Sequence, residues 1–228
     1  MARWAGFLVA AGSGVCAISV PAAARGAPVP TAATADCAPV TVGPDTSLWN
    51  TTRSCILGKA VVQTFLAPDT LISRITVWRP PWDIDALGTH LFVTAVDTTR
   101  TPPWPDARAI LLDGPTVLVR GGVPEVLTEM SFVIDPPLAL PRPGIYAFFL
   151  QRAGCDDGET TLIANDANAY PYGMRWATGR TSGSGGCWLP GAYQVEENID
   201  LIFRIEFCSE GATPVRPMSW GRLKAIYR

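Results

Sequence analysis

Residues 199–207 read IDLIFRIEF, and this alternation of apolar and polar side chains decides the fold class. Successive side chains of a β-strand point to opposite faces of a sheet. The stretch therefore predicts a strand with one apolar face, formed by Ile199, Leu201, Phe203, Ile205 and Phe207. Its other face carries Asp200, Arg204 and Glu206, and we expect Cys208 to point outward with them. A sheet with one buried and one wet side is typical of antiparallel β-proteins.

Other short runs upstream share this strand-like composition and are separated by Gly, Pro and Asp. They predict strands at 60–66, 71–78, 90–97, 107–112, 116–120, 126–134, 145–151 and 160–163. Asp113-Gly114-Pro115 is expected to form a turn between two of them. In 126–134 the expected inward set is Thr128, Met130, Phe132 and Ile134. Many short strands with turn residues between them indicate an all-β, antiparallel sandwich of about 8–10 strands.

The first 24 residues have the pattern of an export signal. Arg3 is their only charge, a mostly apolar stretch follows, and Ala22-Ala23-Ala24 supplies a small-residue cleavage site. A membrane anchor of about 20 residues is the alternative, although glycines interrupt the apolar run. We expect a cleaved signal over 1–24, no stable transmembrane span afterwards, and a secreted or cell-surface protein, extracellular or periplasmic.

The rest of the chain divides into three parts by composition. Residues 25–58 are expected to form a leader and N-terminal extension, 59–208 the β-sandwich domain, and 209–228 a linker and basic amphipathic tail. Ser219 could cap a short tail helix. The side chains of 209–228 carry a net charge of +3, from four basic residues and Glu210. This tail could dock on a partner or an anionic surface, or fold onto the domain.

Loss of the signal leaves five of the six cysteines. Disulfides persist in oxidising compartments, so structural bridges are expected rather than metal binding. A Cys155–Cys187 bridge would close a loop of about 32 residues around an aromatic segment. Cys55–Cys208 is the second expected pair, because first and last strands often neighbour each other. Cys37 would then remain unpaired.

Charge and histidine content exclude several kinds of chemistry. The 18 basic and 20 acidic residues provide no basic excess for nucleic-acid binding. His90 is the only histidine, so we expect neither a catalytic triad nor a zinc site, and no cofactor. Structural calcium remains possible at 156–159 (DDGE) or 165–168 (NDAN). A carbohydrate-active enzyme is an alternative that needs paired carboxylates, and the acids here cluster in expected turns.

Aromatic residues are the best functional lead, because the chain has eight tryptophans, and several lie in Pro/Gly-rich loops. Flat rings in loops suit stacking on sugars, with nearby polar groups for the hydroxyls. The alternative is that these rings cover the ends of the sandwich core. The candidate ligand-binding residues are Tyr170, Tyr172, Trp176 and Trp188.

Several motifs resemble a group of secreted bacterial β-sandwich modules. They are 63–68 (QTFLAP), 71–78 (LISRITVW), 138–140 (LAL), 143–148 (PGIYAF) and 169–173 (AYPYG). The resemblance implies a jelly-roll or galactose-binding-like sandwich over about 59–208, without shared catalytic residues. Such modules are often taken to be carbohydrate-binding or cell-surface components. We therefore expect an exported, non-catalytic protein that binds carbohydrate or another surface ligand, or else a structural or adhesive protein attached through its tail.

Overall fold

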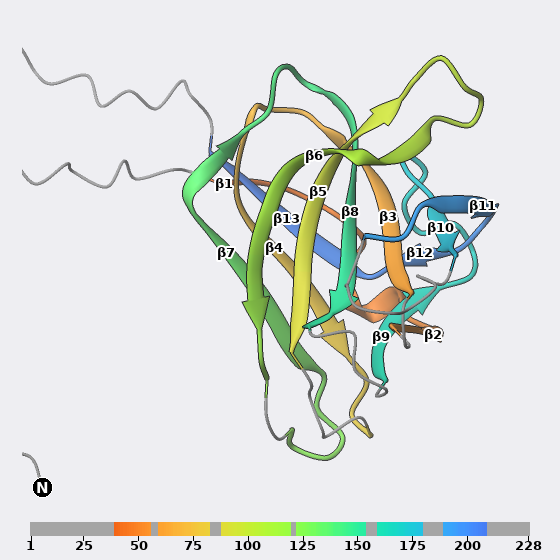
Figure 1. The fold of residues 1–228 in the computed structure, drawn as a ribbon. Helices are drawn as coiled ribbons and strands as arrows, with labels where there is room; N and C mark the ends of the chain where they lie inside the picture. Colours follow the sequence, from red (N-terminus) through yellow and green to blue (C-terminus); the bar gives the residue numbers. More distant parts are fainter. Residues whose placement is uncertain are drawn as a thin grey trace, which may run out of the picture. The chain divides into compact units, whose positions relative to one another are not determined.

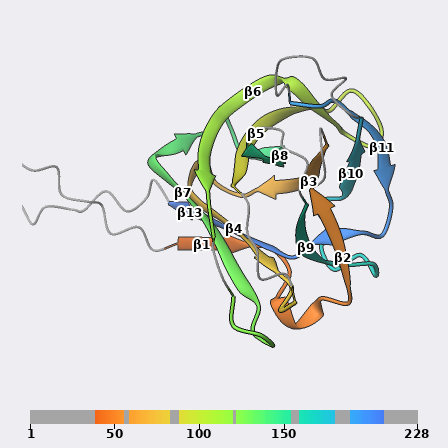
Figure 2. The same ribbon diagram turned by 60° about the horizontal axis from the view of Figure 1, so that its bottom comes forward.

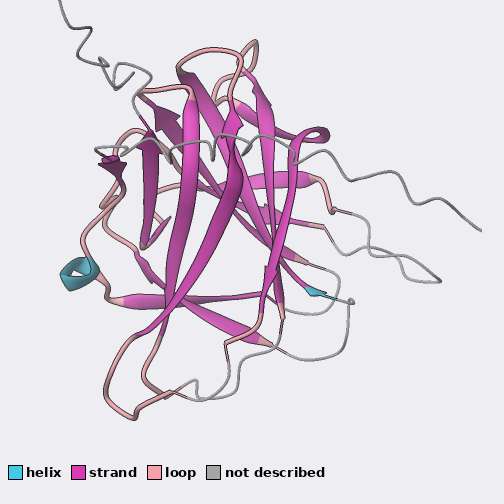
Figure 3. Cartoon of the chain, turned by 90° about the vertical axis from the view of Figure 1, so that its left-hand side faces the viewer, coloured by secondary structure: helices cyan, strands magenta, loops and turns pink. Residues whose placement is uncertain are grey.

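The computed structural model describes residues 39–55, 59–82, 88–119, 122–153, 159–179 and 189–208, and most of this part of the chain is strand (Figures 1 and 3). The strands are β1 (Pro39–Val42), β2 (Thr51–Cys55), β3 (Ala60–Ala67), β4 (Leu71–Arg79), β5 (Thr89–Asp97), β6 (Trp104–Val117), β7 (Thr128–Ala139), β8 (Gly144–Arg152), β9 (Thr160–Asn165), β10 (Arg175–Thr178), β11 (Ala192–Glu196), β12 (Asp200–Leu201) and β13 (Phe203–Cys208). One short 3-10 helix, η1, spans Thr46–Leu48. The expected signal peptide (1–24) and tail (209–228) lie outside these ranges.

The strands form three antiparallel sheets. A four-stranded sheet has the order β1-β13-β4-β7, a six-stranded sheet has the order β11-β10-β3-β8-β5-β6, and a three-stranded sheet has the order β12-β9-β2. The six-stranded sheet curves around the core from β6 to β11 (Figure 2). The expected antiparallel all-β, sandwich-like fold is confirmed. Within the described ranges no helix is long and apolar enough to cross a membrane.

The four-stranded sheet turns one face to the main core, as the alternating pattern predicts, and its other face is partly buried around Thr76 and Trp78. Phe203, Ile205 and Phe207 of β13 lie in the main core, which also receives side chains from the six-stranded sheet. In β7 the buried residues include Met130 and Phe132. The inward set expected there is confirmed for Met130, Phe132 and Ile134, whereas Thr128 is half-buried.

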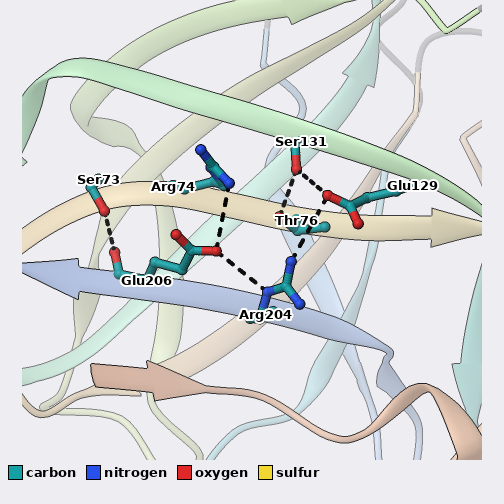
Figure 4. Close-up of polar contacts among 7 residues, drawn as sticks. All are labelled: Ser73, Arg74, Thr76, Glu129, Ser131, Arg204 and Glu206. Atoms are coloured by element: carbon teal, nitrogen blue, oxygen red, sulfur yellow. Dashed lines mark hydrogen bonds and ion pairs between the residues drawn. The ribbon is translucent and has the colours of Figure 1, made fainter. Parts of the chain in front are cut away.

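The outer face of this sheet carries a network of ion pairs (Figure 4). Arg204 lies between two carboxylates, 3.8 Å from Glu129 and 3.5 Å from Glu206. Arg74 is 3.8 Å from Glu206, and Ser131 Oγ donates a 2.7 Å hydrogen bond to Glu129. The charged groups on this wet face are therefore partners of one another.

The six-stranded sheet differs because both of its faces are covered. Phe148 of β8 lies in the main core, while Phe149 lies in a second cluster on the opposite face. Trp176 of β10 belongs to this second cluster, and Trp104 packs its ring edge-on at 4.9 Å. Strands buried on both faces read as near-continuous apolar runs, as β8 does, and β3 departs from such a run only at Gln63 and Thr64, which are buried as well.

Two strands continue through residues that favour turns. β6 continues through Asp113-Gly114-Pro115, so the expected turn there is wrong, and β7 continues through Pro136-Pro137. Proline lacks an N–H donor and is tolerated in edge strands. β6 and β7 are each the last strand of their sheet, which explains why these prolines do not end them.

Four strands were not expected from the sequence. β1 and β2 lie in the segment assigned to the N-terminal extension, and β10 and β11 lie in the aromatic segment and after it. The stretch 199–207 is also interrupted at Ile202, so that Asp200 and Leu201 pair with β9 while β13 pairs with β4. Cys208 was expected to point outward but is buried. Each of these short strands is defined by its partners more than by its own pattern.

Candidate functional site

Asp200, which the alternating pattern assigned to the wet face, is only 1% exposed. Its two oxygens accept hydrogen bonds of 2.9 Å from Gln63 Nε2 and from the Tyr170 backbone N–H. Gln63 Oε1 in turn accepts from the Leu201 N–H at 2.9 Å. Burial raises the pKa of Asp200, and the hydrogen bonds from Tyr170 and Gln63 oppose that shift. This buried carboxylate ties β3 and β12 to the segment that begins at Tyr170.

The segment 170–174, here called the tyrosine loop, is fastened to β3. The Thr64 N–H donates to the Met174 carbonyl at 3.0 Å, and the Met174 N–H donates to Thr64 Oγ1 at 2.9 Å. The Leu66 N–H donates to Tyr170 Oη at 3.1 Å. A Cβ at Gly173 would lie 2.0 Å from the Thr64 carbonyl oxygen, so glycine permits this close approach.

Tyr172 is the exposed member of the tyrosine loop, with 64% of its surface accessible. Its ring meets that of Tyr170 edge-on at 5.9 Å, and Tyr170 packs on Phe203 of the main core at 5.0 Å. The exposed ring is thus supported by a buried ring that belongs to the core. Because the loop is hydrogen-bonded at both ends, Tyr172 presents its face from a fixed position.

A cavity of about 280 Å³ opens beside Tyr172. Its walls are mostly apolar and are formed by Thr64, Leu66, Pro103, Ile145, Pro171, Tyr172, Gly173 and Met174. An aromatic face next to an aliphatic floor suits the C–H face of a ring ligand.

A second, more polar cavity of about 410 Å³ is lined by Trp104, which directly follows Pro103 of the first cavity in the chain. The Arg100 guanidinium lies 4.8 Å from the centre of the Trp104 ring, and its Nε is 3.2 Å from Asp97. Hydrogen bonds from the Thr99 side chain and backbone hold the pKa of Asp97 below its usual value. Asp106 and Arg108 also line this cavity, which therefore offers both acceptors and donors.

The structure separates the four candidate ligand-binding residues. Tyr170 and Trp176 are buried, so in this arrangement a ligand cannot reach their faces. Tyr172 is exposed, and Trp188 lies outside the described residues. Leu66, Pro103 and Trp104 were not among the candidates. Trp104 lies among Pro102, Pro103 and Pro105, a composition typical of a loop, but it begins β6, and nothing in the sequence links it to Tyr172.

The candidate disulfides are not tested by the described residues. Cys155 and Cys187 lie outside them. Cys55 ends β2 opposite Thr160, whereas Cys208 ends β13 opposite Pro39 and is not free. Both pairings stay predictions, although the strand register places Pro39 of β1, rather than a residue of β2, opposite Cys208.

His90 joins two neighbouring strands. Its Nε2 donates to Asp113 Oδ1 at 2.6 Å, and its Nδ1 lies 2.7 Å from Thr116 Oγ1. A carboxylate only accepts, so in the neutral ring Nδ1 is left to accept from the threonine hydroxyl. The sequence did not predict this hydroxyl–imidazole–carboxylate chain, because Asp113 was assigned to a turn and Thr116 to the strand after it.

Of the two candidate calcium-binding segments, the structure describes the second in full and the first only in part. Residues 156–158 of the first are not described. In the second, Asn165 Oδ1 accepts from the Ala167 N–H at 2.7 Å, and Asp166 Oδ1 accepts from Asn50 Nδ2 at 2.7 Å. Among the residues that are described, no three His, Cys, Asp or Glu side chains gather as metal ligands. Calcium binding stays a prediction.

Comparison with known proteins adds no assignment: no protein-family model matches the chain, and no curated protein matches its sequence.

Proposed function

We propose that this is an exported, non-catalytic β-sandwich protein that binds carbohydrate, or another polyhydroxylated cell-surface ligand, at Tyr172. The observation that carries the proposal is the exposed Tyr172 ring on a loop fixed by buried hydrogen bonds. A ring that is already ordered loses little conformational entropy when a ligand stacks on it. A freely moving surface tyrosine would offer no such advantage.

The two cavities, lined by the consecutive residues Pro103 and Trp104, supply the other ligand-binding groups of the proposal. Beside Tyr172 the walls are apolar, and around Trp104 they carry Asp97, Arg100, Asp106 and Arg108. Sugars combine apolar C–H faces with hydroxyl groups that both donate and accept. Carboxylates accept from hydroxyls and guanidinium groups donate to them, so the pair of cavities complements such a ligand.

The carboxylates support binding over glycoside hydrolysis. A hydrolase of this kind needs one carboxyl group whose pKa is raised so that it can donate a proton. The pKa of Asp97 is lowered instead, chiefly by Thr99, and its ion pair with Arg100 favours the charged form further. Asp97 is therefore a poor general acid.

The decisive experiment is a glycan array on the exported chain (25–228), followed by calorimetry with the best sugar. Tyr172→Ala should weaken binding at least ten-fold. Tyr193→Ala is the matched control, because Tyr193 is also an exposed tyrosine but does not line the Tyr172 cavity. The absence of signal from every sugar, or equal binding by Tyr172→Ala, would refute the proposal.

The Thr116–His90–Asp113 chain allows a separate check that the protein is non-catalytic. The purified chain should hydrolyse a nitrophenyl ester no faster than buffer does. Hydrolysis that disappears in His90→Ala would show instead that this chain activates a nucleophile.

A further inference from the structure

One end of the molecule exposes a group of large apolar side chains. Trp82 is 63% exposed, Val123 is 65% exposed, and Val126 and Leu48 are also exposed. Scattered exposed apolar residues are ordinary, but a contiguous group marks an interaction surface. We call Leu48, Trp49, Trp82, Val123 and Val126 the tryptophan end.

Three observations show that these residues are neighbours although they come from distant segments. The Trp49 and Trp82 rings lie 5.8 Å apart. The register of β4 and β7 pairs Arg79 with Thr128, so the residues after β4 run beside the residues before β7. Trp49 and Leu127 pack on the same buried cluster, which contains Trp78. The tryptophan end is thus one surface with its own small core beneath it.

Two exposed acidic residues lie beside this surface, whereas the basic Arg204, whose guanidinium lies over Trp78, is already paired with Glu129 and Glu206. Asp45 and Glu125 are both exposed there, and the pKa of Asp45 is lowered by hydrogen bonds from Ser47. An anionic lipid surface attracts basic segments and repels acidic ones. The partner that fits is therefore a short segment that is apolar and basic.

The chain itself contains such a segment at residues 218–228 (MSWGRLKAIYR). It combines Trp220, Leu223 and Tyr227 with three basic residues, and the whole of 209–228 carries a side-chain charge of +3. Apolar residues at this spacing share one face if the segment is helical on binding. Its composition complements the tryptophan end in both apolar content and charge.

The position of β13 determines which copy supplies the segment. β13 is antiparallel to β4, so Cys208 lies near the Leu71 end of the sheet and the tryptophan end lies beyond Arg79. The nine residues 209–217 reach about 30 Å when fully extended, and the nine residues of β4 also span about 30 Å. The tail would reach its own tryptophan end only when taut, whereas the tail of another molecule has no such restriction.

We propose that the tryptophan end binds residues 218–228 of a second copy of this chain. The contact is head-to-tail, so it generates chains of molecules rather than closed dimers unless the rotation closes a ring. The proposal goes beyond ligand binding at Tyr172 and does not depend on it.

Photo-crosslinking of the exported chain tests this directly. p-Benzoylphenylalanine is placed at position 82, and ¹⁴N- and ¹⁵N-labelled chains are mixed before irradiation. Mixed-isotope cross-links between position 82 and peptides from 218–228 are expected. Cross-links to the tail of the same chain alone, or none to the tail, would overturn the proposal.

Sedimentation at several concentrations gives the second measurement. Trp82→Ser, Val126→Ser and deletion of 218–228 should each weaken self-association at least ten-fold. Val133→Ser is the control, because Val133 is an exposed valine on the outer face of β7 and should leave association unchanged. A chain that is monomeric at all concentrations, or one whose association survives Trp82→Ser and the tail deletion, excludes the head-to-tail contact.

Discussion

The four-stranded and six-stranded sheets contribute to one core but differ on their other faces. Outside β13 and β4 lie Arg204, Arg74 and Glu206, which pair with each other in contact with water. Outside β3 and β8 lie Val62, Phe149 and the rings of Trp176 and Trp104. The candidate ligand site is built on the six-stranded sheet, where β3 is fixed from both sides. A fixed strand is what allows an exposed ring such as Tyr172 to be held in place.

The largest effect should come from the doubly covered sheet. Phe149→Ala removes a fully buried ring from the second cluster, and we expect a loss of about 3–5 kcal/mol in unfolding free energy, as for other buried Phe→Ala changes. Urea denaturation measures it. A loss below about 1 kcal/mol would mean that the outer face of this sheet is not a packed core.

The close approach of the tyrosine loop to β3 should give the next largest effect. Gly173→Ala places a methyl group against the Thr64 carbonyl, so we expect about 2–3 kcal/mol of destabilisation from overpacking. Ligand binding should weaken with it, because the loop must move away from β3. Gly179→Ala is the control, since a Cβ there meets nothing within 4 Å and Gly179 lines neither cavity. Equal losses of unfolding free energy from the two changes would show that the tyrosine loop is not held in close contact with β3.

Asp200 is a buried carboxylate, unlike the surface carboxylates of the four-stranded sheet, and its contribution to stability should depend on pH. Because its pKa is raised in the folded state, the folded chain binds this proton more tightly than the unfolded chain does. The contribution of Asp200 to stability is thus most favourable below its unfolded pKa and falls as pH rises through its folded pKa. Denaturation between pH 3 and 7 should show wild type losing stability relative to Asp200→Asn as pH rises. A constant difference would contradict this direction.

The smallest effect should come from the network in Figure 4. Arg204→Ala removes two ion pairs on a half-exposed surface, and such pairs contribute less than about 1 kcal/mol. The difference from wild type should shrink further in 0.5 M salt. A larger or salt-independent loss would show that Arg204 acts mainly through its packing over Trp78.

The contrast between the two sheets also explains which features of the fold could be predicted from the sequence. The alternation in β13 and β7 predicted which residues face the core, because water on one side enforces a period of two. β3 and β8 were found as strands, but their second buried face was not, since a continuous apolar run does not say what covers it. Asp200 was misplaced because its burial depends on Gln63, which lies 137 positions away in the chain. Tyr172 was one of four aromatic candidates. Only the packing of Tyr170 and Trp176 into the cores distinguished it from those two.

The prolines of β6 and β7 affect whether these edge strands can pair with strands of another molecule. Each of these edge strands lacks amide hydrogens at Pro115 or at Pro136 and Pro137. An incoming strand would find gaps in the row of donors it needs, so growth of the sheets from molecule to molecule is discouraged along these edges. Strand-by-strand stacking of molecules is thereby discouraged at β6 and β7.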